Sequence, residues 1–133
     1  MIKKLSGFTL IEIIIAIAIF SILAMISLPI FTDMIRESRR FDAKSSLMSI
    51  EQEQETFRTN NTTYGSISDI WDGDQTPENY YTLTITNSSS TGYTATATAN
   101  GDQANDDENG VNCDPLQVQV VGLQTTRTPA ACW

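Results

Sequence analysis

Histidine is absent from the 133-residue chain, and only two cysteines occur. Without histidine, Ser-His-Asp and Cys-His catalysis lack their base, and the usual zinc ligand sets are incomplete. A glycine-rich phosphate loop is also missing. Because of these absences, the sequence offers no candidate catalytic residues, so we expect a protein that is not an enzyme and needs no cofactor.

Basic residues are scarce. Eight Lys and Arg stand against sixteen Asp and Glu, which gives a formal net charge of −8 at pH 7. Broad binding to nucleic acid needs many cations to neutralise phosphates, and after Lys44 the chain offers only Arg58 and Arg127. Nucleic acid is therefore not an expected partner, although a small local basic patch remains compatible with this composition.

The apolar residues are concentrated near the N-terminus. Residues 13–31 read IIIAIAIFSILAMISLPIF, a run without one charge that is long enough to cross a bilayer as a helix. From residue 51 onward the chain is polar and of a size suited to a small soluble domain. Because Lys3 and Lys4 precede the run and basic residues stay on the cytoplasmic side, we expect the N-terminus inside and the polar part outside.

The hexapeptide GFTLIE, residues 7–12, stands at the start of this run. A secretory signal has a shorter apolar core, and its small-residue cleavage site follows that core. Here the small residue, Gly7, precedes the run, so cleavage there leaves the apolar segment in the mature chain. An acid such as Glu12 is costly inside a membrane helix and therefore usually has a function.

This arrangement resembles the type IV pilin family, whose members carry a short basic leader ending in Gly, an aromatic residue, Thr-Leu-Ile-Glu and an apolar helix. The matching residues are Gly7, Phe8, Thr9, Leu10, Ile11 and Glu12. The resemblance implies that a prepilin peptidase cuts between Gly7 and Phe8 and methylates the new amine. It also implies that Glu12 pairs with the N-terminal amine of a neighbouring subunit during assembly. A plain helix-capping role for Glu12 is a compatible alternative.

The same resemblance implies an α+β fold, in which a long N-terminal helix packs on a three- or four-stranded antiparallel sheet. It divides the chain into a cleaved leader (1–7), a transmembrane or filament-core helix (8–31) and a periplasmic or extracellular head (32–133). The expected function is that of a structural subunit of a type IV pilus, inserted in the bacterial inner membrane and assembled into a surface filament for adhesion, motility or uptake. Its partners would be other pilin subunits, the peptidase and the assembly machinery. The alternatives are a pseudopilin of a type II secretion system and a DNA-uptake minor pilin.

The helical pattern continues beyond the apolar run. Ala43, Leu47, Ile50, Gln54 and Phe57 fall on one helix face, which predicts a single helix over about residues 8–58. Pro29 is expected to kink this helix because it lacks a backbone donor. Related pilins commonly have a glycine eight residues before that proline, where this chain has Ser21, so the extent of helix melting in a filament stays open.

Three later segments alternate apolar and polar residues, as half-buried strands of an antiparallel sheet do. They are YYTLTIT (80–86), GYTATATA (92–99) and LQVQV (116–120). The turn-rich segment 59–81 is expected to be a connecting loop, with Tyr64, Ile67, Ile70 and Trp71 packed beneath it. Residues 100–112 are expected to form a second loop, between the last two strands.

The two cysteines, Cys113 and Cys132, lie in the part expected outside the cell, where an even count indicates a disulfide. Two buried free thiols are the alternative. An oxygen-rich stretch is a weak calcium candidate, because calcium takes six to eight such ligands. Its residues are Asp102, Asn105, Asp106, Asp107 and Glu108. Their spacing matches no EF-hand, so we favour a solvated acidic loop without metal.

Overall fold

The computed structural model describes residues 7–133. The chain forms two compact units, with the boundary between Met34 and Ile35. We call residues 7–34 the stem and residues 35–133 the head. One helix, α1 (Leu10–Arg58), contributes to both units.

Apolar side chains cover the surface of the stem, and Phe8, Phe20 and Met25 are each more than 70% exposed. Ser21 is compatible with the helix because its hydroxyl donates to the carbonyl of Ile17 at 2.8 Å, which satisfies the polar group locally. The helix runs without interruption through Pro29, and it begins two residues after the predicted start at Phe8. By length and composition, α1 is the one helix in the described residues that could cross a membrane. The kink at Pro29 stays a prediction.

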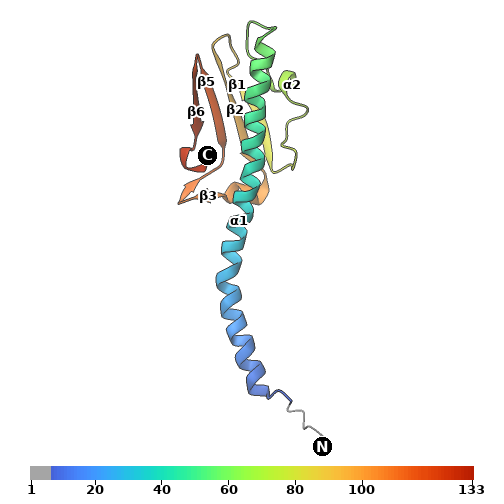
Figure 1. Cartoon of the computed structure of the whole chain (residues 1–133), viewed down its shortest axis with the longest axis vertical. Coiled ribbons are helices and arrows are strands. Elements are labelled where there is room, and N and C mark those ends of the chain that lie inside the picture. The colour runs from blue at the N-terminus through green and yellow to red at the C-terminus, as the bar shows by residue number, and fades with distance from the viewer. Residues whose placement is uncertain (1–6) are drawn as a thin grey trace, which may run out of the picture. The chain divides into compact units, whose positions relative to one another are not determined.

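The predicted buried face of α1 is confirmed in the head. Ala43, Leu47, Ile50 and Gln54 have no exposed surface, and Phe57 is half-buried. Figure 1 shows this half of α1 lying along the sheet. The helix face and the sheet share one hydrophobic core, whose sheet residues include Tyr81, Leu83, Tyr93, Ala95, Ala97, Leu116 and Val118.

The sheet has four antiparallel strands in the order β1-β2-β5-β6. They are β1 (Tyr81–Thr86), β2 (Gly92–Ala99), β5 (Leu116–Val121) and β6 (Gln124–Thr128). The register places Leu83 opposite Ala97 and Ala95 opposite Val118. The alternate apolar residues of β1, β2 and β5 therefore face α1, as their period of two predicts.

The alternation of residue types does not predict β6, because all five of its residues are exposed. Residues 100–112 are also more ordered than the predicted loop. They hold the 3-10 turn η1 (Gly101–Asn105) and a hairpin of β3 (Asp107–Glu108) and β4 (Val111–Asn112). The turn residues Asn109 and Gly110 have φ angles of 54° and 79°, and Asn-Gly is the preferred sequence for such two-residue turns.

The segment between α1 and β1 contains a short helix, α2 (Ile67–Ile70). Tyr64 is 8% exposed and belongs to the core, while Ile67, Ile70 and Trp71 are partly buried and pack against it. The expectation that these residues lie beneath the connecting loop is therefore confirmed.

The predicted disulfide is present. Cys113 and Cys132 are bridged, with Cα atoms 5.6 Å apart, and both residues are buried. The bridge joins the segment before β5 to the C-terminal turn η2 (Ala130–Cys132). The two cysteines are 19 residues apart in the sequence, and on the chain-entropy model a disulfide that closes a loop of this length contributes about 3 kcal/mol to stability.

Gln54 is the polar member of the buried helix face, and the structure gives it two partners. Its Nε2 donates to the carbonyl of Gly65 at 2.9 Å, and its Oε1 accepts from the Gly65 N–H at 2.8 Å. One side chain therefore satisfies both polar groups of a backbone residue in the loop after α1.

We predict that Gln54→Leu destabilises the head by about 1–3 kcal/mol, because it leaves the buried N–H of Gly65 without a partner, whereas the Gly65 carbonyl keeps the Ser88 hydroxyl as a donor at 2.9 Å. Gln52→Leu, at an exposed position of the same helix, is the matched control and should stay within about 0.5 kcal/mol of the parent. Chemical denaturation followed by circular dichroism measures both. Equal stability of the two variants would contradict this account of Gln54.

Candidate assembly site and arginine-bound loop

The N-terminal end of α1 brings Thr9 and Glu12 together. The N–H and the hydroxyl of Thr9 donate to Glu12 Oε2 at 2.9 and 2.8 Å, and the Glu12 N–H donates to Thr9 Oγ1 at 3.3 Å. This reciprocal pattern is a capping box, with Thr9 as the N-cap. It explains why the helix begins at Leu10 rather than at Phe8.

The capping box occupies one oxygen of the Glu12 carboxylate. Within the described part of the chain, Glu12 Oε1 accepts no hydrogen bond, and the residue is exposed. The carboxylate can therefore cap its own helix and still accept a donor from another molecule. The geometry is compatible with both roles expected for Glu12.

Gly7 and Phe8 precede the helix in a non-helical, exposed segment. Exposed backbone outside regular structure is where proteases act most readily, so this conformation is compatible with the predicted cleavage between these residues. The rest of the expected leader, residues 1–6, lies outside the described residues.

Two arginines on successive turns of α1 bind the acidic stretch that sequence analysis marked as a calcium candidate. Arg36 donates from Nε and Nη2 to the two oxygens of Asp102, at 3.1 and 3.0 Å. Arg40 donates in the same way to Asp106, at 2.7 and 3.1 Å, and its Nη1 donates to Glu108 at 3.1 Å. Two-point contacts of this kind are among the stronger hydrogen-bonded ion pairs. We call residues 102–108 the arginine-bound loop.

These contacts differ from both expectations for the acidic stretch, the weak calcium site and the favoured solvated loop, because Asp106 is buried and bound to Arg40. Asp102, Asp106 and Glu108 each have an arginine partner, and Asp107 is exposed. Within residues 7–133, no three His, Cys, Asp or Glu side chains lie together in a way that could hold a metal ion. The guanidinium groups supply the positive charge that a calcium ion would otherwise bring to these carboxylates.

Burial distinguishes the Arg40 pair from the Arg36 pair. Arg40 and Asp106 are 3% and 2% exposed. Burial acts to lower the pKa of Arg40, but hydrogen bonds to Asp106 and Glu108 more than reverse this effect and raise the pKa. At the exposed pair, Arg36 holds the pKa of Asp102 below its ordinary value.

Gln103 connects the same loop to the core. Its Nε2 donates to the carbonyl of Arg36 at 2.8 Å and to the hydroxyl of Tyr81 at 2.9 Å. Burial raises the pKa of Tyr81 to about 12. Sequence analysis missed Arg36, Arg40 and Gln103, and the available signal was the spacing of four residues between the two arginines.

Two family models match the chain. The model described as "Type IV minor pilin ComP, DNA uptake sequence receptor" matches residues 29–117, which is more than half of the chain. The model described as "Prokaryotic N-terminal methylation motif" matches residues 2–28, which include GFTLIE. No curated protein matches the chain.

We predict that Arg40→Met destabilises the head by about 3–5 kcal/mol, because it leaves the buried Asp106 carboxylate without its counter-charge. Adding Asp106→Leu removes the unpaired charge and should restore most of the loss. Arg39→Met is the control, since Arg39 stacks on Tyr80 and has no salt bridge within residues 7–133, so its loss should cost about 1 kcal/mol or less. Urea denaturation measures all three variants. A double variant no more stable than Arg40→Met would contradict the role given to the buried pair.

Proposed function

The chain belongs to the type IV minor pilin family of ComP, and from this premise we propose that it is a structural subunit that polymerises into a helical surface filament. The observation that carries the proposal is the position of Glu12. Its carboxylate lies at the N-terminal end of an exposed apolar helix and keeps one oxygen available to an outside donor.

Cleavage between Gly7 and Phe8 would create a new N-terminal amine only four residues before Glu12. In a filament, the methylated amine of one subunit meets the Glu12 carboxylate of its neighbour. An acid in an apolar environment is stabilised by an opposite charge, so assembly offers a partner that the membrane does not. The charge pair also fixes the stagger between subunits, because only one stagger brings the two groups together.

The location follows from the same elements. The apolar segment of residues 8–31 holds the unassembled subunit in the inner membrane, and Lys3 and Lys4 keep the leader, residues 1–7, on the cytoplasmic side. Residues 32–133 then lie outside, where the Cys113–Cys132 bridge is stable. Prepilin peptidase and the assembly machinery are the partners that process and polymerise the subunit.

A second candidate function is DNA uptake, and the printed description of the matching family favours it. The chain's own cations give it little support. Arg36, Arg40 and Arg127 are paired with carboxylates, and Arg58 donates to the backbone carbonyls of Thr62 and Ser90. The other two cations of the head are half-buried: Arg39, which stacks on Tyr80, and Lys44. Because phosphate binding depends on available positive charge, we infer that this head does not bind the phosphate backbone of DNA.

We predict that Glu12→Gln and Glu12→Ala both abolish filament formation while the disulfide still forms. Glutamine keeps the capping box, since Gln is accepted at this position, but it removes the charge. Glu37→Gln, at an exposed position further along α1, is the control and should assemble normally. Electron microscopy of sheared filaments measures the yield. Normal filaments from Glu12→Gln would mean that Glu12 acts as a helix cap and not as a charge partner.

We predict that the full-length protein in neutral detergent gives no shift of short duplex DNA in electrophoresis at low salt. The acidic net charge and the paired arginines are the physical reason. A complex that forms and weakens steeply as salt rises would instead establish the DNA-uptake role, because phosphate contacts release counterions.

A further inference from the structure

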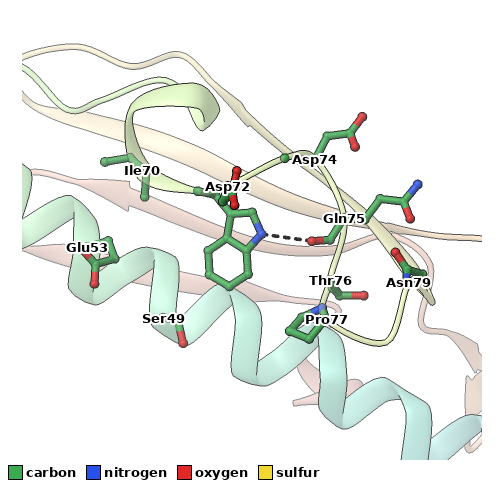
Figure 2. A pocket seen from close by; sticks show the side chains of 11 residues that line it. Ser49, Glu53, Ile70, Asp72, Asp74, Gln75, Thr76, Pro77 and Asn79 are labelled. Carbon is green, nitrogen blue, oxygen red and sulfur yellow. Dashed lines mark hydrogen bonds between the residues drawn. The ribbon is translucent and has the colours of Figure 1, made fainter.

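A groove lies between α1 and the segment that follows α2. Its volume is about 680 Å³. Ser49 and Glu53 of α1 form one side, and residues 70–77 with Asn79 form the rest (Figure 2). The groove belongs wholly to the head and is separate from both the N-terminal end of α1 and the arginine-bound loop.

The loop side of the groove is held in place before any ligand arrives. The Trp71 Nε1–H donates to the carbonyl of Gln75 at 3.0 Å, the contact drawn as a dashed line in Figure 2. The Leu83 N–H donates to the carbonyl of Asp74 at 2.7 Å, and the Thr76 N–H donates to the carbonyl of Tyr81 at 3.0 Å. These bonds fasten the loop to β1 and fix the indole, so little conformational entropy is lost when a ligand binds.

Trp71 gives the groove an aromatic wall. The side chain is half-buried, and it both packs on the core and lines the groove. Because its N–H is already bonded to Gln75, the surface that it offers a ligand is the ring. Among aromatic side chains, Trp attracts cations most strongly through its ring face.

Three carboxylates line the same groove, namely Glu53, Asp72 and Asp74. All three are exposed, and within residues 7–133 none of them has an ion pair, in contrast to Asp102, Asp106 and Glu108. No Lys or Arg lines the groove. Its potential is therefore negative, which attracts cations and repels phosphate.

The lining residues indicate the kind of cation. The described residues contain no group of three His, Cys, Asp or Glu side chains that could hold a metal ion. A guanidinium or ammonium group on an alkyl stem suits the groove, because the stem can pack on the indole while the charged head needs only one carboxylate to pair with. We propose that the Trp71 groove binds a lysine or arginine side chain of a partner protein.

The test uses the full-length protein in neutral detergent and the peptide acetyl-Gly-Arg-Gly-amide. The control peptide has citrulline in place of arginine, because citrulline is similar in shape but uncharged. By calorimetry, the arginine peptide should bind at least about tenfold more tightly than the citrulline peptide. Rising salt should weaken the binding of the arginine peptide and leave the binding of the citrulline peptide almost unchanged. The indole N–H signal of Trp71 should shift in the NMR spectrum on binding.

Matched variants locate the binding. The double variant Asp72→Asn with Asp74→Asn should weaken binding of the arginine peptide about tenfold or more. Trp71→Leu should weaken it to a similar extent. Glu37→Gln with Asp107→Asn changes the net charge equally at exposed positions outside the groove, and it should leave affinity within about twofold. Three results would overturn the proposal: equal affinity for the two peptides, equal losses in the two charge variants, or tighter binding of free choline than of the arginine peptide.

Discussion

The packing of α1 on the sheet is the contact on which the rest of the head depends. Ala43, Leu47 and Ile50 bury one helix face in the common core. The residues beside that face then fasten the irregular segments to the helix. Arg36 and Arg40 hold the loop before β3, Gln54 holds the loop after α1, and Glu51 meets Arg127 of β6 at 2.8 Å. Because each attachment begins on the same rigid helix, a displacement of α1 would disturb all of them together.

The part of this fold that could be predicted from the sequence is the part that burial controls. The face of α1 and the alternation in β1, β2 and β5 are periodic because one side of each element meets the core. β6 carries no such period, since every residue in it is exposed. The arginine pairs join residues 66 or more positions apart, and no local pattern encodes a contact at that separation. The composition of the acidic stretch made it a weak calcium candidate, with a solvated loop favoured, and neither expectation included the arginine partners that the fold places at Asp102, Asp106 and Glu108.

At the candidate assembly site, a sequence motif predicts the residues, and the structure adds their local geometry. The GFTLIE motif indicated Gly7, Phe8 and Glu12 because their roles belong to a short, ordered sequence. The capping box adds Thr9, which holds the Glu12 carboxylate towards the N-terminal end of the helix. The Trp71 groove was beyond prediction, because its walls come from α1 and from a loop whose path depends on backbone bonds to β1.

The distribution of charge in the head also has a pattern. Most arginines of the head are paired with carboxylates of the same chain, whereas the carboxylates of the groove are exposed.

The arginine-bound loop has a consequence for the medium in which the head can stay folded. A bound ion stabilises a protein by mass action, so its contribution falls when the surrounding solution is dilute in that ion. Arg36 and Arg40 are covalently part of the chain, and the charge they offer to Asp102, Asp106 and Glu108 cannot be diluted or removed by a chelator. A subunit exposed on a cell surface would keep the buried contact between Arg40 and Asp106 without relying on divalent ions from the surrounding fluid, because burial shields this pair from salt.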